Sequence, residues 1–169
     1  MPKGTDDTKK ERRLYEPVKA LLLETLKTKY QELHLEITAD KTFSNKLKAQ
    51  VSSNRNIIFL FLKDAAPDIT GFIKEQYGVG FVVAEVKPGK LKLDDIYQTR
   101  KYAELFDAKY AFLVTAEEIP EEMKRLTNVV YPLLYIGDYR TKAFTLVQFD
   151  EETRSFKEYF PENPLSKSV

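Results

Sequence analysis

The chain contains no cysteine and only one histidine. The missing thiols exclude disulfides, thiolate zinc sites, iron–sulfur clusters and cysteine nucleophiles. A single histidine, His34, cannot supply a multi-histidine zinc site. It has no Gly-x-Ser-x-Gly elbow to complete a serine triad. We therefore interpret His34 as an ordinary strand residue of the alternating stretch 33–37.

Long apolar runs and a large net charge are also missing. The longest apolar run, 57–62, is far too short to span a bilayer, and the first residues are polar rather than a signal-like apolar segment. We therefore expect a soluble, cytoplasmic protein without a membrane partner. The net charge of +1 excludes a polycation that coats nucleic acid indiscriminately, so any such surface must be local. Candidate cations form three groups: Lys9, Lys10, Arg12 and Arg13; Lys41, Lys46, Lys48 and Arg55; Lys87, Lys90, Lys92, Arg100 and Lys101.

The organisation of the chain predicts one α/β domain over residues 1–169, with flexible ends at about 1–8 and 163–169. There is no repeat, low-complexity tract or internal linker. Hydrophobic periodicity predicts helices at 8–30, 95–106 and 121–126, and strands at 33–38, 57–62, 68–74, 79–87, 110–115, 144–149 and 155–160. Residues 41–56 are polar without a clear period. Pro17 implies that the first helix either begins near Tyr15 or is kinked. We expect a mixed sheet with helices against it.

Two short motifs lie on the predicted hairpin of strands 68–74 and 79–87. Pro67-Asp68 begins the first strand, and Glu85-Val86-Lys87 ends the second. If the turn is centred between Gln76 and Tyr77, cross-strand partners have residue numbers that sum to 153. Asp68 then lies directly opposite Glu85, on the same face of the sheet. A turn longer by one residue would spoil this opposition.

The chemistry of this predicted arrangement favours a divalent cation. Two opposed carboxylates repel each other unless a cation, a proton or water separates them. Magnesium prefers one or two carboxylates together with waters and phosphate oxygens. Lys87 lies two residues after Glu85 and so shares its face, where an ammonium can hold an attacking water and offset charge on a phosphate.

These residues, and the order of elements from about Thr8 to Thr115, resemble the PD-(D/E)XK nuclease superfamily. The resemblance implies a restriction-endonuclease-like αβββαβ core, here with a C-terminal β extension, and Mg²⁺ or Mn²⁺ as cofactor. It implies that Asp68 and Glu85 bind the metal with the Val86 carbonyl, and that Lys87 serves the nucleophilic water. Members often add a glutamate from the first helix. Glu16 is the best candidate, with Glu11 and Glu24 as alternatives.

The helix after the motif contains Gln98 and Tyr102, which resemble the Gln-x-x-x-Tyr element of RecB-type members. The resemblance implies that these two residues reach a phosphate backbone or orient Lys87. As basic residues beside the motif, Lys90 and Arg100 are further candidates for contacts to nucleic acid. A structural alternative stays open: Asp95 and Gln98 also fit a capping box with Asp95 as N-cap, and Tyr102 fits the core.

The sequence therefore predicts a metal-dependent nuclease that hydrolyses DNA phosphodiester bonds, as in DNA repair or recombination. The narrower resemblances are to archaeal Holliday-junction resolvases, which would favour a homodimer, and to type I restriction nuclease domains. Two other hypotheses stay open: a catalytically silent nucleic-acid-binding module, and a partner-binding α/β domain in which Asp68 and Glu85 are far apart. The sequence does not distinguish DNA from RNA, or endonuclease from exonuclease.

Overall fold

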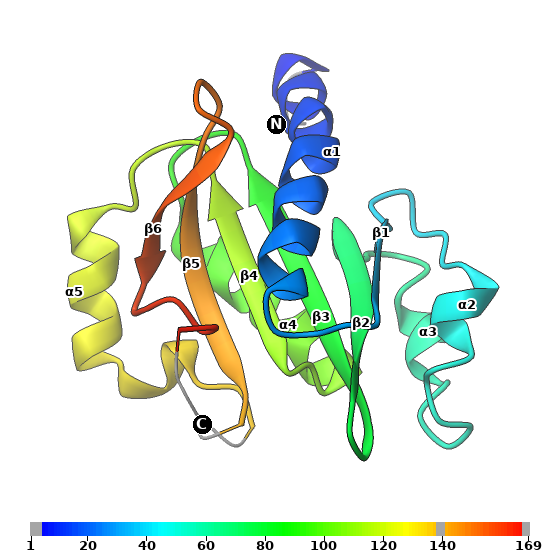
Figure 1. Cartoon of the computed structure of the whole chain (residues 1–169). Helices are drawn as coiled ribbons and strands as arrows, with labels where there is room; N and C mark the ends of the chain where they lie inside the picture. The colour runs from blue at the N-terminus through cyan, green and yellow to red at the C-terminus, as the bar shows by residue number, and fades with distance from the viewer. Residues whose placement is uncertain (1–4, 138–140, 167–169) are drawn as a thin grey trace.

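A computed structural model of the chain describes residues 5–137 and 141–166, which form one α/β layer structure around a six-stranded sheet (Figure 1). The elements follow in the order α1 (Thr5–Lys27), β1 (Leu33–Ile37), α2 (Asn45–Lys48), α3 (Ile58–Phe61), β2 (Ile69–Glu75), β3 (Gly78–Lys87), α4 (Leu93–Phe106), β4 (Tyr110–Thr115), α5 (Glu121–Val129), a 3₁₀ turn (Tyr131–Leu134), β5 (Ala143–Asp150) and β6 (Ser155–Phe160). The expected α/β class with a mixed sheet is confirmed.

The strands lie side by side in sequence order. β1, β2 and β3 are antiparallel neighbours, β3, β4 and β5 are parallel, and β6 returns antiparallel to β5. The β2–β3 hairpin closes at Glu75 opposite Gly78, and Ile69 pairs with Ala84. Every pair sums to 153, so the predicted register is confirmed, and the next pair beyond the ladder is Asp68 with Glu85.

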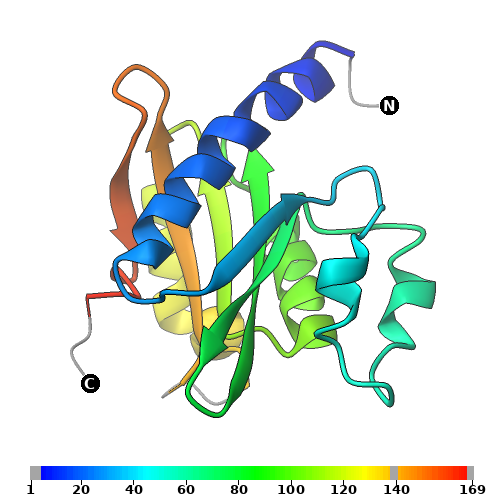
Figure 2. The ribbon, with the colours of Figure 1, turned by 45° about the vertical axis from the view of Figure 1, so that its right-hand side comes forward.

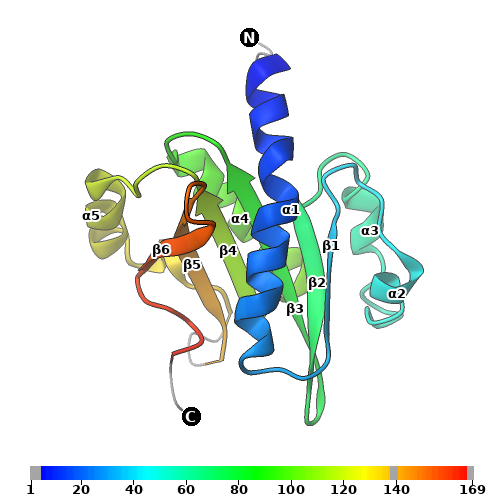
Figure 3. The same ribbon diagram turned by 45° about the horizontal axis from the view of Figure 1, so that its top comes forward.

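Helix α1 covers one face of the sheet, as Figures 2 and 3 both show. Its buried stripe of Leu14, Val18, Leu22 and Leu26 packs on inward-facing residues of β2, β3 and β4. The helix continues through Pro17, so the predicted start near Tyr15 is wrong. A proline removes one main-chain hydrogen bond, which a long buried stripe on both sides of it can offset.

Helix α4 covers the opposite face, joined by α2, α3 and α5 in a second hydrophobic core. Alternation along β3 divides its side chains between the two cores. Val82, Ala84 and Val86 contact the α1 side, whereas Val83 contacts the α4 side. Glu85 and Lys87 have the parity of Val83 and therefore extend toward α4.

The predicted strand at 57–62 is wrong, because these residues lie in and around α3. Ile58 and Leu62 are buried while Leu60 is 56% exposed, which is a helical spacing of i and i+4 rather than the alternation of a strand. Sequence reasoning also missed α2 within 41–56. Both helices are single turns, too short to leave a clear period.

The ends of the chain were predicted to be flexible. Residues 5–8 belong to the first turns of α1, and 163–166 follow β6, whereas 1–4 and 167–169 lie outside the described residues. None of the helices in the described part of the chain has the length and apolarity needed to cross a bilayer.

Candidate active site

Asp68 and Glu85 meet at the end of the sheet where β3 finishes. The Asp68 main-chain N–H donates to Glu85 Oε1 at 3.2 Å, and the Val86 N–H donates to Asp68 Oδ2 at 2.8 Å. Asp68 is 6% exposed and Glu85 only 2%. The two carboxylates are therefore not far apart, as the partner-binding alternative had supposed. We call Glu11, Asp68 and Glu85 the carboxylate cluster; the place of Glu11 is described below.

Thr38, just after β1, fixes the main chain of Pro67-Asp68. Its N–H donates to the Asp68 carbonyl at 2.8 Å, and its hydroxyl donates to the Pro67 carbonyl at 2.6 Å. The same hydroxyl lies 2.7 Å from Thr70 Oγ1, and both threonines are fully buried. This local network orients Asp68 toward β3, and no sequence motif had indicated it.

Lys87 reaches between the two strands and α4. Its Nζ lies 3.8 Å from Glu85 Oε2 and 3.7 Å from Asp95 Oδ1. Asp95 was open as a helix N-cap, but the N-cap is Lys92, whose N–H donates to Asp95 Oδ2 at 2.8 Å. Asp95 as N-cap is wrong because the N-cap lies three residues earlier, whereas the other part of that alternative is confirmed, since Tyr102 is 1% exposed and belongs to the core on the α4 side. Asp95 instead holds the first turn of α4 with one oxygen and faces Lys87 with the other.

Helix α1 brings a glutamate to the site, but not Glu16. The Glu16 side chain is 72% exposed and pairs with Lys19 at 3.4 Å, away from the cluster. Glu11 instead accepts a 3.0 Å hydrogen bond from the Tyr15 hydroxyl, which also lies 3.1 Å from Asp68 Oδ1. The N-terminal part of α1 extends past the ends of β3 and β4 in Figures 1 and 3. The shared Tyr15 hydroxyl places Glu11 near Asp68.

The choice between these glutamates was visible in the sequence. Glu11 precedes Tyr15 by four residues and Val18 by seven, so it continues the buried stripe of α1 toward the N-terminus. Glu16 follows Tyr15 directly and points about 100° away around the helix axis. Helical phase therefore identifies Glu11 rather than Glu16. Glu24, the third candidate, lines a hollow near the other end of α1.

Burial makes the ionised carboxylates costly. It raises the pKa of Asp68 to about 6, although the Val86 N–H opposes this shift, and the charge of Glu11 adds to it. Burial followed by the charge of Asp68 raises the pKa of Glu85 well above its usual range. Burial lowers the pKa of Lys87, but Glu85, Glu11 and Asp95 outweigh it and leave the pKa above its ordinary value. The lysine is therefore an ammonium at neutral pH.

The donor set suits a hard divalent cation. It consists of carboxylate oxygens, with a lysine beside them and no sulfur or histidine. Among the residues that the structure describes, no three His, Cys, Asp or Glu side chains converge closely enough to enclose an ion. Magnesium fits such an incomplete set, because it keeps several waters and accepts phosphate oxygens as further ligands. The Val86 N–H is used by Asp68, and a role for its carbonyl stays a prediction.

The four residues predicted to contact nucleic acid do not lie together: Gln98 and Tyr102 lie near the carboxylate cluster, whereas Arg100 and Lys90 are paired with glutamates elsewhere. Gln98 donates to the Tyr102 hydroxyl at 3.3 Å, which confirms their shared helix face. Burial and the charges of Glu85 and Asp68 raise the pKa of Tyr102, so its buried hydroxyl lies in the field of the cluster. Arg100 is bound to Glu104 and to the carbonyl of Pro132, on another side of α4.

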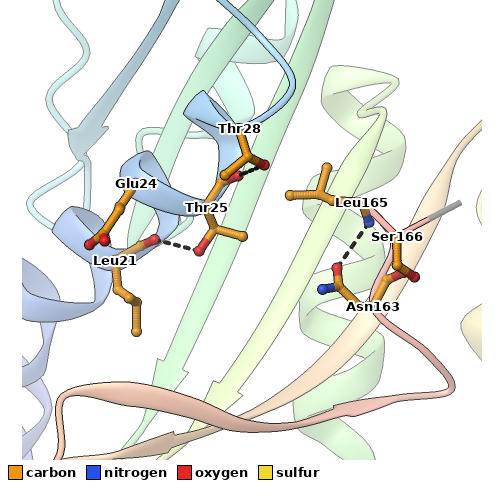
Figure 4. Close-up of a pocket in the computed structure, with 7 residues that line it drawn as sticks. All are labelled: Leu21, Glu24, Thr25, Thr28, Asn163, Leu165 and Ser166. Carbon is orange, nitrogen blue, oxygen red and sulfur yellow. Dashed lines mark hydrogen bonds between the residues drawn. The ribbon is translucent and has the colours of Figure 1, made fainter. Parts of the chain in front are cut away.

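Lys90 lies 2.6 Å from Glu122, at a hollow also lined by Glu117, Glu118 and Glu121. These glutamates disfavour a phosphate there. A second hollow lies between the end of α1 and the segment after β6, where Thr25 and Asn163 bond to nearby main chain (Figure 4). Neither hollow includes a residue of the carboxylate cluster.

In comparisons with known proteins, the chain matches no family model, no curated protein and no solved structure. A function must therefore be inferred from its own residues.

Proposed function

We propose that the chain is a metal-dependent nuclease of the PD-(D/E)XK type that hydrolyses phosphodiester bonds in DNA. The observation that carries the proposal is the convergence of Asp68, Glu85 and Lys87 at the end of one hairpin, with Glu11 brought there by α1. The order α1, β1, β2, β3, α4, β4 supports the restriction-endonuclease-like core that the sequence suggested.

The burial of the cluster supports a catalytic rather than a structural role. Two nearly buried carboxylates whose pKa values are raised destabilise the fold when both ionise. A hydrophobic pair would stabilise the same positions without that cost. A bound divalent cation would favour the ionised forms of both carboxylates and so offset the cost of burying their charges.

In the proposed reaction, Asp68 and Glu85 would hold the cation, and Glu11 would add a third negative charge near it. When bound, the metal lowers the pKa of a coordinated water and stabilises charge on the phosphate oxygens. The Lys87 ammonium donates hydrogen bonds to the attacking water and to a phosphate oxygen. The water oxygen forms a bond to phosphorus as the opposite P–O bond breaks, in line; the attacking water gives up its proton to solvent, and the leaving oxygen takes a proton from solvent to become an alcohol. Asp95 keeps Lys87 directed into the site.

A cleavage assay with Mg²⁺ and Mn²⁺ tests this function on single-stranded, duplex, flap and junction DNA, with RNA as a further substrate. Asp68→Asn and Lys87→Ala should each lower the rate by about 10²-fold or more. Their matched controls, Asp94→Asn and Lys27→Ala, alter exposed residues and should cleave as the wild type does. Equal cleavage by the wild type and both site variants would assign the activity to a contaminant and reject the proposal. A wild type that binds DNA without cleaving it would favour the silent module.

A further inference from the structure

The segment between β1 and β2, residues 39–66, leaves the sheet and returns to it at the same point. Thr38 at its start is hydrogen-bonded to Pro67 and Asp68 at its end. We call these residues the β1–β2 segment. It carries α2 and α3, which lie together beyond the β1 edge in Figures 2 and 3. The two ends of the segment are therefore held together by hydrogen bonds that include the main chain of Asp68.

The β1–β2 segment concentrates positive charge. It holds five cations and two acids, a net charge of +3, whereas the whole chain has +1. Its four lysines, Lys41, Lys46, Lys48 and Lys63, are all exposed, and none forms an ion pair within the described part of the chain. By contrast, Lys90 and Lys124 elsewhere on the surface have glutamate partners. These four ammonium groups are available to a polyanion.

The same segment exposes a cluster of large apolar side chains. Ile57 is 53% exposed, Leu60 56% and Phe61 66%. These three side chains are not part of the hydrophobic core, whereas Ile58 and Leu62 of the same stretch are. Lys48 of α2 lies 5.8 Å from the ring centroid of Phe59, so cations and apolar groups are neighbours here. The segment thus carries an exposed aromatic side chain, Phe61, and lysines without ion-pair partners, which are the two features that bind bases by stacking and phosphates by charge.

Three kinds of partner could cover this surface: a second copy of the chain, a nucleic acid duplex or an unpaired strand. The positive charge and the exposed apolar side chains favour the last. A second copy of the chain would bring the same lysines toward each other across a two-fold axis, which like charges oppose. A duplex presents phosphates but keeps its bases stacked away from an apolar side chain. An unpaired strand presents both phosphates and open base faces.

We propose that the β1–β2 segment binds an unpaired stretch of a nucleic acid strand, with Phe61 stacking on a base and Lys46 and Lys48 contacting phosphates. The choice of nucleic acid as the polyanion rests on the proposed nuclease function. The segment begins and ends at Thr38 and Pro67, whose hydrogen bonds also hold the main chain of Asp68.

Binding without cleavage tests this proposal. Fluorescence anisotropy in EDTA measures the affinity of a labelled oligo-dT and of a hairpin duplex of equal length, over a range of salt concentrations. Phe61→Ala should weaken oligo-dT binding by about tenfold and duplex binding much less. The double variant Lys46→Glu/Lys48→Glu should lower the slope of log affinity against log salt by about 1.4, that is, roughly 0.7 for each lost phosphate contact.

Matched controls share the chemistry but lie elsewhere. Tyr77→Ala removes an aromatic side chain that is 93% exposed, and Lys27→Glu/Lys29→Glu makes the same charge change at the end of α1. Both controls should bind as the wild type does. Thermal unfolding checks that every variant is folded.

Three results would overturn the proposal: no oligonucleotide binding by the wild type, equal effects of site and control variants, or a dimer in sedimentation that Phe61→Ala dissociates. The last would assign the surface to a second copy of the chain. Failure of the nuclease function looks different, since binding would persist and depend on Phe61 while no DNA is cleaved. Cleavage and binding unaffected by Phe61→Ala would instead reject only the binding surface.

Discussion

The Tyr15 hydroxyl lies 3.1 Å from Asp68 Oδ1, across 53 positions of sequence, and 3.0 Å from Glu11 Oε1. A hydroxyl has one proton, so Tyr15 donates to one of the two carboxylates at a time. The buried tyrosine therefore couples α1 to the metal-binding strand that we propose. Burial, with the charges of Asp68 and Glu11, raises the pKa of Tyr15, so the hydroxyl keeps its proton at neutral pH.

Tyr15→Phe should weaken metal binding without abolishing cleavage. Groups that hydrogen-bond to metal ligands orient them, and their loss commonly costs 10- to 100-fold in metal affinity. We expect the Mg²⁺ concentration for half-maximal cleavage to rise by about tenfold, while the rate at saturating Mg²⁺ stays within about threefold of the wild type. A Mg²⁺ titration of the cleavage rate measures both. Tyr77→Phe is the control at an exposed position, and an unchanged half-maximal concentration for Tyr15→Phe would contradict the coupling.

Glu11→Gln and Glu16→Gln compare two glutamates of one helix. Glu11 faces Asp68 through Tyr15, whereas Glu16 is exposed beside Lys19. Glu11→Gln should lower the cleavage rate by about tenfold or more, because a negative charge beside the cation is lost. Glu16→Gln should leave the rate unchanged. The opposite ranking in the same assay would show that α1 is rotated relative to the structure.

Asp68→Asn should stabilise the metal-free protein at neutral pH. The pKa of Asp68 is raised from its ordinary value of 3.8 to about 6, chiefly by burial. Between these values the folded state binds more protons than the unfolded state, so the free energy of unfolding falls as pH rises from about 4 to about 6. The raised pKa of Glu85 adds to that fall in the same direction. Asparagine keeps an acceptor for the Val86 N–H without the charge.

Thermal unfolding in EDTA across this pH range measures the effect. The variant should unfold at a higher temperature than the wild type at pH 7.5, and its stability should depend less on pH. Mg²⁺ should raise the unfolding temperature of the wild type and much less that of the variant. Asp94→Asn serves as the exposed control. A variant less stable than the wild type at pH 7.5 would mean that the Asp68 charge already stabilises the metal-free fold.

Thr38→Val should displace the Pro67-Asp68 main chain. The substitution keeps the shape but removes the hydroxyl that bonds to the Pro67 carbonyl and to Thr70. A buried acceptor left without a partner costs about 1–3 kcal/mol. We expect that loss in urea unfolding, together with slower cleavage. Thr42→Val, at an exposed threonine four residues later, should change neither quantity. Normal stability with normal cleavage would assign Thr38 no part in placing Asp68.

The features of the fold that could be predicted from the sequence depend on the length of the hairpin turn and on the hydrophobic pattern of the strands. A two-residue turn at Gln76-Tyr77 sets the register of the whole hairpin, so the opposition of Asp68 and Glu85 followed from counting. The strand Tyr110–Thr115 was found with its observed ends because it is apolar throughout and buried. Periodicity failed at α2 and α3, since one helical turn contains too few residues to distinguish it from a strand.

By itself, the sequence determined the local partners of the site: two carboxylates on a hairpin, and a lysine two residues beyond the second. Those relations depend on the strand period and on a short turn, which act within about twenty residues. The helical phase of α1 already favours Glu11 in the sequence, but only the tertiary structure decided that Glu11 joins them through Tyr15, that Thr38 holds the Asp68 main chain, and that Asp95 faces Lys87. Such contacts join elements far apart in the chain, and helix phase and packing against the sheet determine them together.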